Sequence, residues 1–445
     1  MIDKLLLKKY SDNISDDDVN NLLINSISNN PSKKILLNRE LVNNYNHIFS
    51  DKRKINQQIS DQFNTGRCWI FSFNNILRNK LINQYKLKDD FNLSSNYFSF
   101  YDKLEKCNYF LDNIEHTKDN TLQDKLVEYF LDEPISDGGS WNMAINIIEK
   151  YGIVPEDIMK ETYNSKNTSN LNSIIIQNLK RFSYTIRSTK KYDKSDMLYT
   201  IYKILCFFLG KPPTDFTWEY YDNDDKYNKH PNLTPSKFYK KFVKKGCKFN
   251  PKDYVICINY PLKRFPFYKV FKLNYCTNID KNEEFICYNL PIREIKSLVK
   301  KSIDKDEIVF FGSDIGKYYY NKDGILDNEI FNYDVLFNKN VNEMSKGDKL
   351  SYRQSFPNHA MVIIGYNKQS NNINKWAVEN TWGSNSGNKG YITMSSDWFD
   401  EYAYLFVIHK KNFTENQLNK YKKGMRQKIS IQPWDILACE ALVLN

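Results

Sequence analysis

The hydrophobic pattern of this chain changes from helical spacing in its first half to strand-like runs in its second half. Between residues 68 and about 165 the apolar residues recur at a spacing near 3.6, as they do in 70–81, and a second helix is expected at 140–151, where Gly152 gives a stop. From residue 306 onward, short apolar runs such as 308–313 and 360–366 are separated by turns rich in Asn and Gly. A chain that places its helices before its strands in this way is expected to form an α+β fold.

Read from end to end, the same pattern predicts one folded unit over residues 1–445. Its consecutive segments are an N-terminal wrap at 1–60, a helical lobe at 61–165, an insertion or framework region at 166–300, a β-rich lobe at 301–412 and a C-terminal arm at 413–445. A hydrophobic content of 41% and an aromatic content of 15% are typical of a globular protein rather than a disordered one.

The sequence shows no sign of export, of a membrane anchor or of a metal centre. Residues 1–10 are too short and too charged for a secretory signal, and the apolar window 201–210 is interrupted by Lys203. The eight cysteines include no Cys-x-x-Cys pair and no grouping with histidine at zinc-ligand spacing. We therefore expect a cytoplasmic protein with free thiols that uses neither a metal nor a cofactor.

The formal net charge of +11 has two interpretations. Basic stretches such as 240–245 and 420–426 allow a nucleic-acid-binding face. The simpler interpretation, a well-solvated basic surface, is favoured because no aromatic-interleaved binding motif accompanies the charge.

Cys68 stands where a nucleophilic cysteine is expected. It follows a Gly-containing turn and begins the helix-like run 70–81, so a helix N-terminus would stabilise its thiolate. Gln62 lies in the preceding segment, from which its side-chain N–H can reach an oxyanion beside the sulfur. The flanking Arg67 and Trp69 are assigned packing roles.

A cysteine nucleophile also needs a base, and His359 is the candidate among five histidines. It opens the apolar run 360–366, whereas the other four lie in polar loops, in the N-terminal segment or at an exposed strand end. Antiparallel pairing through the loop 367–374 would return Asn380 to the side of His359, where its amide oxygen can accept the imidazole N–H. An imidazolium in this place would lower the thiol pKa, and Trp382 could shield the hydrogen bond from water.

Taken singly, each of these residues has an ordinary structural explanation. A lone buried cysteine is usually inert packing, a strand histidine is usually a satisfied core residue, and Asn-x-Trp-Gly alone is a turn. The order Gln, Cys, His, Asn makes coincidence a poor explanation and indicates a thiol hydrolase.

These residues resemble the papain superfamily of cysteine peptidases, and within it the intracellular branch of bleomycin hydrolase and aminopeptidase C. Residues 62–71 resemble the oxyanion and nucleophile segment of that branch, 359–361 its histidine motif and 378–383 its asparagine motif. Further similarity to the branch is found at 93–102, 137–141, 149–152, 212–220, 311–316 and 398–402.

The resemblance implies a papain-like, two-lobed α+β cysteine peptidase with a helical lobe, a β-barrel-like antiparallel lobe, helical insertions and a C-terminal arm that enters the cleft. It implies that Cys68 is the nucleophile and that His359 is the general base and acid. Asn380 would be the residue that orients the His359 imidazole. Gln62 would donate to the oxyanion together with the backbone N–H of Cys68.

The family pattern also implies substrate-binding residues and an assembly. Gly138 and Gly139 resemble a glycine pair along which a substrate backbone lies, although a plain turn is the alternative. The branch forms homohexamers with an internal channel, and its C-terminal carboxylate, here Asn445, pairs with the free α-amine of a peptide substrate. This makes its members aminopeptidases, and some of them bind nucleic acid.

Two departures from the family pattern bear on these expectations. Thr381 replaces the usual Ser in the asparagine motif, a conservative change from which we expect little effect. The chain also continues beyond Trp434-Asp435 for longer than the family's ending does. A tail of that length would block the cleft, fold aside or be trimmed, so an endopeptidase remains an alternative to the aminopeptidase. A basic hexameric scaffold that binds nucleic acid is the second alternative.

Overall fold

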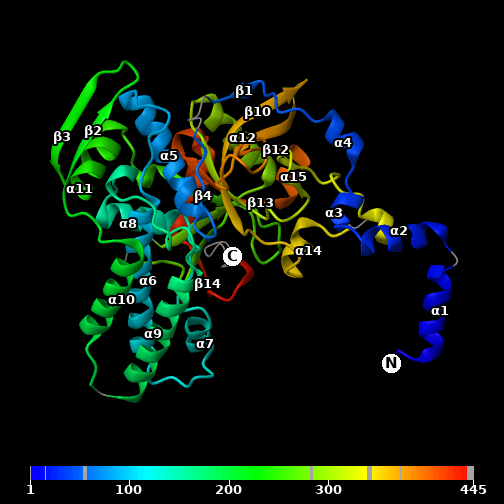
Figure 1. Cartoon of the computed structure of the whole chain (residues 1–445), viewed down its shortest axis with the longest axis horizontal. Coiled ribbons are helices and arrows are strands. Elements are labelled where there is room, and N and C mark those ends of the chain that lie inside the picture. Colours follow the sequence, from blue (N-terminus) through cyan, green and yellow to red (C-terminus); the bar gives the residue numbers. More distant parts are fainter. Residues whose placement is uncertain are drawn as a thin grey trace.

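The computed structural model describes residues 2–15, 17–53, 58–189, 191–280, 284–337, 343–370 and 372–437. Figure 1 shows a helical part and a β-rich part side by side, with the N-terminal helices projecting from the β-rich part. No helix in the described ranges is both long and apolar enough to cross a membrane.

The helical part is built around one central helix. Its helices are α5 (Cys68–Tyr85), α6 (Ser95–His116), α7 (Lys125–Asp132), α8 (Trp141–Tyr151), α9 (Ser169–Ser188) and α10 (Lys194–Leu209). Nearly every side chain of α5 up to Ile82 is buried, as expected for a helix with other elements on all sides. It ends before Lys86, whose φ of 51° is left-handed. The predicted helix start at Cys68 and the predicted helix before Gly152 are both confirmed.

Several short elements lie between the main helices and strands along the chain. These are the hairpin β2 (Phe216–Tyr221) and β3 (Tyr227–Leu233), the helix α11 (Pro235–Phe238), a π-helical turn at Tyr239–Gly246 and 3-10 turns at Glu156–Ile158, Pro251–Asp253 and Lys410–Asn412. The hairpin packs Trp218 against Phe238 and Phe242, which fixes it to the end of the helical part.

The strands of the β-rich part form one large sheet that is mainly antiparallel. They are β1 (Asp51–Lys52), β4 (Tyr254–Ile258), β5 (Val270–Leu273), β6 (Phe285–Asn289), β7 (Val309–Ser313), β8 (Tyr319–Tyr320), β9 (Ile325–Leu326), β10 (His359–Gln369), β11 (Asn372–Glu379), β12 (Tyr391–Ser395), β13 (Ala403–His409) and β14 (Ile429–Ile431). Their order is β14-β5-β6-β4-β13-β7-β10-β11-β12-β9-β8, with β1 paired to β10. The β-rich part thus begins near residue 254, earlier than the predicted boundary at 301, because β4, β5 and β6 come from the region assigned to the insertion.

The sheet packs against helices α12 (Ile292–Asp304), α15 (Ser396–Tyr402) and α16 (Glu415–Arg426). The connection between β9 and β10 contains two short helices, α13 (Asp334–Phe337) and α14 (Lys346–Ser351). After α16, β14 pairs in parallel with β5, and the arm continues as far as the fully buried Leu437. Asp435 forms an ion pair with Arg264 at 3.2 Å. Asn445, the predicted ligand for the substrate amine, lies outside the described residues.

The N-terminal segment differs from the predicted wrap. Its helices are α1 (Lys4–Ser15), α2 (Asp18–Ser28), α3 (Ser32–Ile35) and α4 (Arg39–Asn44). None of the residues of α1 and α2 is buried, and Figure 1 shows both helices extending away from the rest of the chain. Packing begins at Leu36, which lies in a small core with Ile330 and Phe331.

Candidate active site

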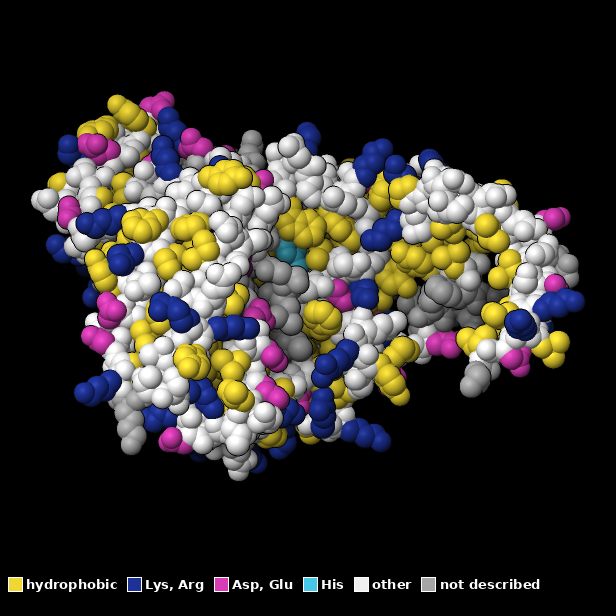
Figure 2. Space-filling model, turned by 60° about the horizontal axis from the view of Figure 1, so that its bottom comes forward, with side chains coloured by type: hydrophobic (Ala, Val, Ile, Leu, Met, Phe, Trp, Pro, Cys, Tyr) yellow, Lys and Arg dark blue, Asp and Glu magenta, His cyan; other side chains and the backbone are white. Residues whose placement is uncertain are grey.

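Cys68 lies at the junction of the helical and β-rich parts. It is the first residue of α5 and is 1% exposed. Its Sγ accepts a hydrogen bond from the backbone N–H of Ala360 at 3.4 Å. Because Ala360 follows His359 on β10, this contact brings the thiol beside the imidazole-bearing residue of the opposite part. Figure 2 shows a hollow near the middle of one face of the molecule, with a histidine side chain visible in it.

The predicted strand pairing places Asn380 against His359. β10 and β11 are antiparallel, with Val362 opposite Glu379, so the residue after β11 returns to the beginning of β10. The His359 Nε2 and the Asn380 Oδ1 are 2.8 Å apart. The Trp382 ring lies 4.6 Å from the imidazole, centroid to centroid, and covers this hydrogen bond as expected.

Burial shifts the pKa values of the cysteine and the histidine in opposite directions. Burial raises the pKa of the Cys68 thiol to about 11, although backbone N–H groups, first among them that of Ala360, oppose the shift. Burial also lowers the pKa of His359 to about 4, against the effect of its hydrogen bond to Asn380. The expectation of an imidazolium that lowers the thiol pKa stays a prediction.

Gln62 is held by both parts of the molecule. Its Oε1 accepts a hydrogen bond from Thr381 Oγ1 at 2.6 Å, and its backbone N–H donates to the Thr381 carbonyl at 2.7 Å. Its Nε2 donates to the Thr65 carbonyl at 2.6 Å. An amide nitrogen carries two hydrogens, so a second N–H remains for an oxyanion. The hydroxyl of Thr381, which the change from Ser to Thr keeps, fixes the Gln62 side chain.

Replacing Thr381 by valine tests that hydrogen bond. Valine keeps the shape of threonine but leaves the Gln62 Oε1 without its donor, so the amide can rotate away from its working orientation. We expect kcat to fall about 10-fold with KM little changed, because an oxyanion donor acts on the transition state. Thr381→Ser keeps the hydroxyl and serves as the control. Equal kcat in the valine and serine variants would contradict this role.

The glycine pair is packed against Trp69, the residue that follows Cys68. A Cβ on Gly139 would lie 2.5 Å from the Trp69 indole ring, so only glycine fits there. Trp69 also donates its indole N–H to the Asp137 carbonyl at 2.7 Å, in keeping with its predicted packing role. The buried Lys106 donates to the Gly138 carbonyl at 2.5 Å. Sequence reasoning missed Lys106. Nothing in the sequence distinguishes it from the other charged residues of α6.

Gly139→Ala is expected to distort this loop. The added methyl group must displace the indole or the loop, and such overpacking typically costs about 1–3 kcal/mol. Because the loop would carry the substrate backbone, we expect KM for peptides to rise and the melting temperature to fall. Steady-state kinetics and thermal unfolding measure the two effects. Unchanged KM and stability in the Gly139→Ala variant would show that the glycine is not required.

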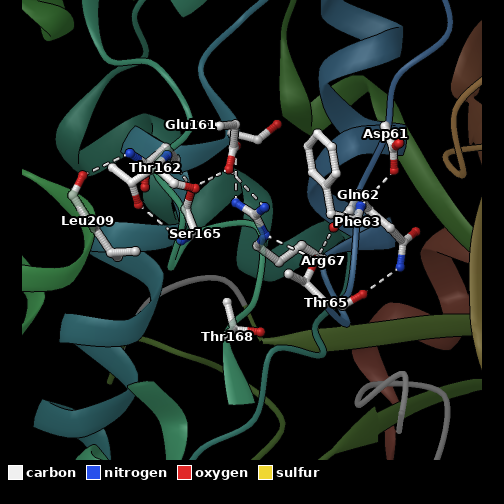
Figure 3. Close-up of polar contacts among 12 residues, drawn as sticks. Asp61, Gln62, Phe63, Thr65, Arg67, Glu161, Thr162, Ser165, Thr168 and Leu209 are labelled. Atoms are coloured by element: carbon white, nitrogen blue, oxygen red, sulfur yellow. Dashed lines mark hydrogen bonds and ion pairs between the residues drawn. The ribbon is translucent and has the colours of Figure 1, made fainter. Parts of the chain in front are cut away.

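Arg67 does more than pack, which corrects its predicted role. Its guanidinium is buried, forms a bidentate ion pair with Glu161 and donates from Nε to Thr65 (Figure 3).

A second buried ion pair joins the two parts of the molecule. Arg78 on α5 contacts Glu379 on β11 at 3.0 Å, and neither side chain is more than 2% exposed.

No group of three or more His, Cys, Asp or Glu side chains in the described part of the chain is placed to hold a metal ion. The thiols of Cys68, Cys107, Cys206, Cys247 and Cys257 are free. The chemistry that this arrangement supports is nucleophilic attack by sulfur, with proton transfer through an oriented imidazole.

Comparison with known proteins agrees with this geometry. The model of the Peptidase C1-like family matches residues 1–438. Aminopeptidase C from Listeria innocua is 36% identical over 391 residues, covering 86% of this chain and 87% of the relative. Bleomycin hydrolase from Gallus gallus is 33% identical over 417 residues, covering 90% of each. The crystal structure of PepW from Lactobacillus rhamnosis HN001 has a TM-score of 0.94 at 35% identity and covers 99% of both chains. This chain therefore belongs to the Peptidase C1-like family and has its papain-like, two-lobed α+β fold.

Proposed function

We propose that Cys68, His359, Asn380 and Gln62 carry out peptide hydrolysis in this papain-like cysteine aminopeptidase. The observation that carries the proposal is the convergence of the thiol, the imidazole and the Asn380 amide from two lobes, through the 3.4 Å and 2.8 Å contacts. The Cys68 sulfur attacks the scissile carbonyl carbon while its proton passes to His359. Asn380 holds the imidazole plane and stabilises the imidazolium that forms.

The remaining steps use the same groups. The second Nε2–H of Gln62 and the backbone N–H of Cys68, at the N-terminus of α5, stabilise the oxyanion. Collapse of the tetrahedral intermediate breaks the C–N bond, and His359 gives its proton to the leaving amine. A water molecule, deprotonated by His359, then attacks the thioester, which releases the carboxylic acid and restores the thiol.

The substrates proposed are peptides with a free N-terminus. Leu437 is buried in the large apolar core that extends from the helical part to the sheet, so the arm packs against the body of the molecule, and the proposal extends this arm toward the cleft. Asn445 would then supply the carboxylate that pairs with the substrate amine, and Gly138-Gly139 would line the substrate backbone.

Free-amine and N-acetylated fluorogenic peptides of one sequence test this specificity. The full-length chain and a form ending at Ala441 should both be assayed. An aminopeptidase cleaves the free-amine peptide and discriminates strongly against the blocked one. Efficient cleavage of the blocked peptide by both forms would establish the endopeptidase alternative. Cleavage of it by the shortened form alone would show that the tail enforces the specificity.

We further propose a homohexamer. The supporting feature is the projecting pair α1 and α2, on which Leu5 is 79% exposed and Leu22 67% exposed. Exposed leucines on a protruding helix pair are suited to burial against a second copy of the chain. Sedimentation equilibrium should give six chains for the full protein and fewer when residues 1–30 are removed. An unchanged mass would contradict this role of the two helices.

Nucleic-acid binding is the second candidate function. Basic side chains gather on and after α16 at Lys420, Lys422, Lys423, Arg426 and Lys428. Retention of a Cys68→Ala variant on DNA, with affinity falling steeply as salt increases, would favour this function. Absence of binding near physiological salt would exclude it.

We also propose a cytoplasmic location for the protein. The free thiols accord with this location.

A further inference from the structure

Arg67, immediately before the nucleophile, is part of a buried ion pair. Its Nη1 and Nη2 donate to the two carboxylate oxygens of Glu161 at 3.2 and 3.0 Å. The side chains are 1% and 9% exposed. Ser165 Oγ donates to the same carboxylate, which anchors Glu161 from its other side. A planar guanidinium suits this two-point contact and leaves Nε free to donate elsewhere.

A third N–H of Arg67 leads to the segment that holds Gln62. Its Nε donates to Thr65 Oγ1 at 3.2 Å, and that hydroxyl donates to the Gln62 carbonyl. The Gln62 side chain in turn donates to the Thr65 carbonyl. Thr65 therefore connects the ion pair to both the backbone and the side chain of Gln62. Figure 3 shows this connection from Glu161 through Arg67 and Thr65.

The segment that holds Gln62, residues 61–65, borders a cavity on its other side. Asp61, Phe63 and Glu161 line a cavity of about 380 Å³ between α5 and the turn that follows α8. Phe63 is 39% exposed and has a positive φ of 54°, a conformation that side-chain-bearing residues adopt rarely. A segment that borders a cavity and holds a strained residue depends on its hydrogen bonds for a fixed position.

We propose that the Arg67–Glu161 ion pair, acting through Thr65, positions the Gln62 amide for the oxyanion. Arg67, Glu161 and Thr65 are positioning residues, since none of them is proposed to touch the substrate. The inference rests on the proposed oxyanion role of Gln62. It adds an account of which residues hold the Gln62 side chain in position. Displacement of a catalytic group by about 1 Å reduces rates by about 100-fold, which sets the scale of the expected effect.

Thr65→Val and Thr65→Ser form the principal matched pair. Valine removes the hydroxyl that joins Arg67 to Gln62, whereas serine keeps it. We expect kcat to fall about 10-fold in the valine variant and to stay within about twofold of the parent in the serine variant, with KM unchanged in both. A peptide aldehyde forms a hemithioacetal whose oxygen occupies the oxyanion position, so its affinity should fall in parallel with kcat.

Glu161→Gln tests the ion pair itself. It leaves the Arg67 charge without its partner, and we expect kcat to fall about 100-fold. Glu401→Gln breaks a partly buried pair with Lys349 in the β-rich lobe, whose Nζ–Oε1 distance is 2.7 Å, and controls for a general loss of stability. This control should lower the melting temperature without the loss of kcat.

The same variants made in a Gln62→Ala background separate the inference from the proposed function. If Gln62→Ala alone leaves kcat unchanged, the proposed oxyanion role of Gln62 fails. If it reduces kcat by about 100-fold, the Thr65 and Glu161 variants should add less than about twofold in that background. Full additivity there, or an unchanged kcat for Thr65→Val and Glu161→Gln in the parent, would overturn the positioning role.

Discussion

Replacing Cys68 by alanine is expected to reduce peptidase activity by about 10⁵-fold or more, because the attacking atom is removed and no acyl-enzyme can form. The fold should be retained. Cys68 is 1% exposed, and the substitution removes one sulfur atom that makes a long hydrogen bond to Ala360. Initial rates on a free-amine fluorogenic peptide and the melting temperature measure the two quantities separately.

Cys107→Ala is the matched control. Cys107 is also a fully buried free thiol in the helical part, and burial raises its pKa to about 12. It lies on α6, away from the hydrogen bonds that surround Cys68, so its loss should cost stability without abolishing activity. Retained activity in Cys68→Ala, or equal losses in the two variants, would contradict the assignment of the nucleophile.

Arg78→Met is expected to have the largest effect on stability. The variant leaves Glu379 buried without its partner, which typically costs about 3–5 kcal/mol. Asn75 Nδ2 would remain as a donor to Glu379 Oε1 at 3.1 Å, and a single neutral donor does not replace a guanidinium. Denaturant unfolding measures the loss. We also expect kcat to fall, because Glu379 directly precedes Asn380 and its pairing helps to fix the end of β11.

The pH dependence of this effect has a definite sign. Burial raises the pKa of Glu379, and Arg78 opposes that shift. Without Arg78 the carboxyl is more readily protonated, so the folded state avoids a buried charge as the pH falls. The stability difference between Arg78→Met and the parent should shrink between pH 8 and pH 5. Arg78→Met/Glu379→Leu should recover part of the stability at pH 8, and an unchanged or larger loss in that double variant would contradict the account.

Some features of the fold and site could be predicted because local patterns along the chain determine them. The helix that begins at Cys68 was predicted from the spacing of its apolar residues, and the helix before Gly152 from its apolar face and glycine stop. The pairing that joins His359 to Asn380 required only two strands and the short loop between them. Each of these predictions depends on neighbours in sequence.

The parts that escaped prediction depend on residues far apart in the chain. Arg67 meets Glu161 and Arg78 meets Glu379, and no periodicity relates either arginine to its partner. The strands of 254–289 join the sheet through β13, which comes more than a hundred residues later, so their membership was not visible locally. The segment that forms α1 and α2 was predicted to wrap around the core of its own chain. An amphipathic helix has the same sequence pattern whether its apolar face packs on its own chain or on another, so the sequence could not show that these faces are exposed.

The most direct test of the central claim is to identify the atom that a substrate-like reagent alkylates. A peptidyl chloromethyl ketone with a free N-terminus should form one covalent adduct per chain, mapped by mass spectrometry to Cys68, with activity lost in proportion. The Cys68→Ala variant should remain unlabelled under the same conditions. Inactivation with Cys68 unmodified, or stoichiometric labelling of the alanine variant, would show that sulfur at this position is not the nucleophile.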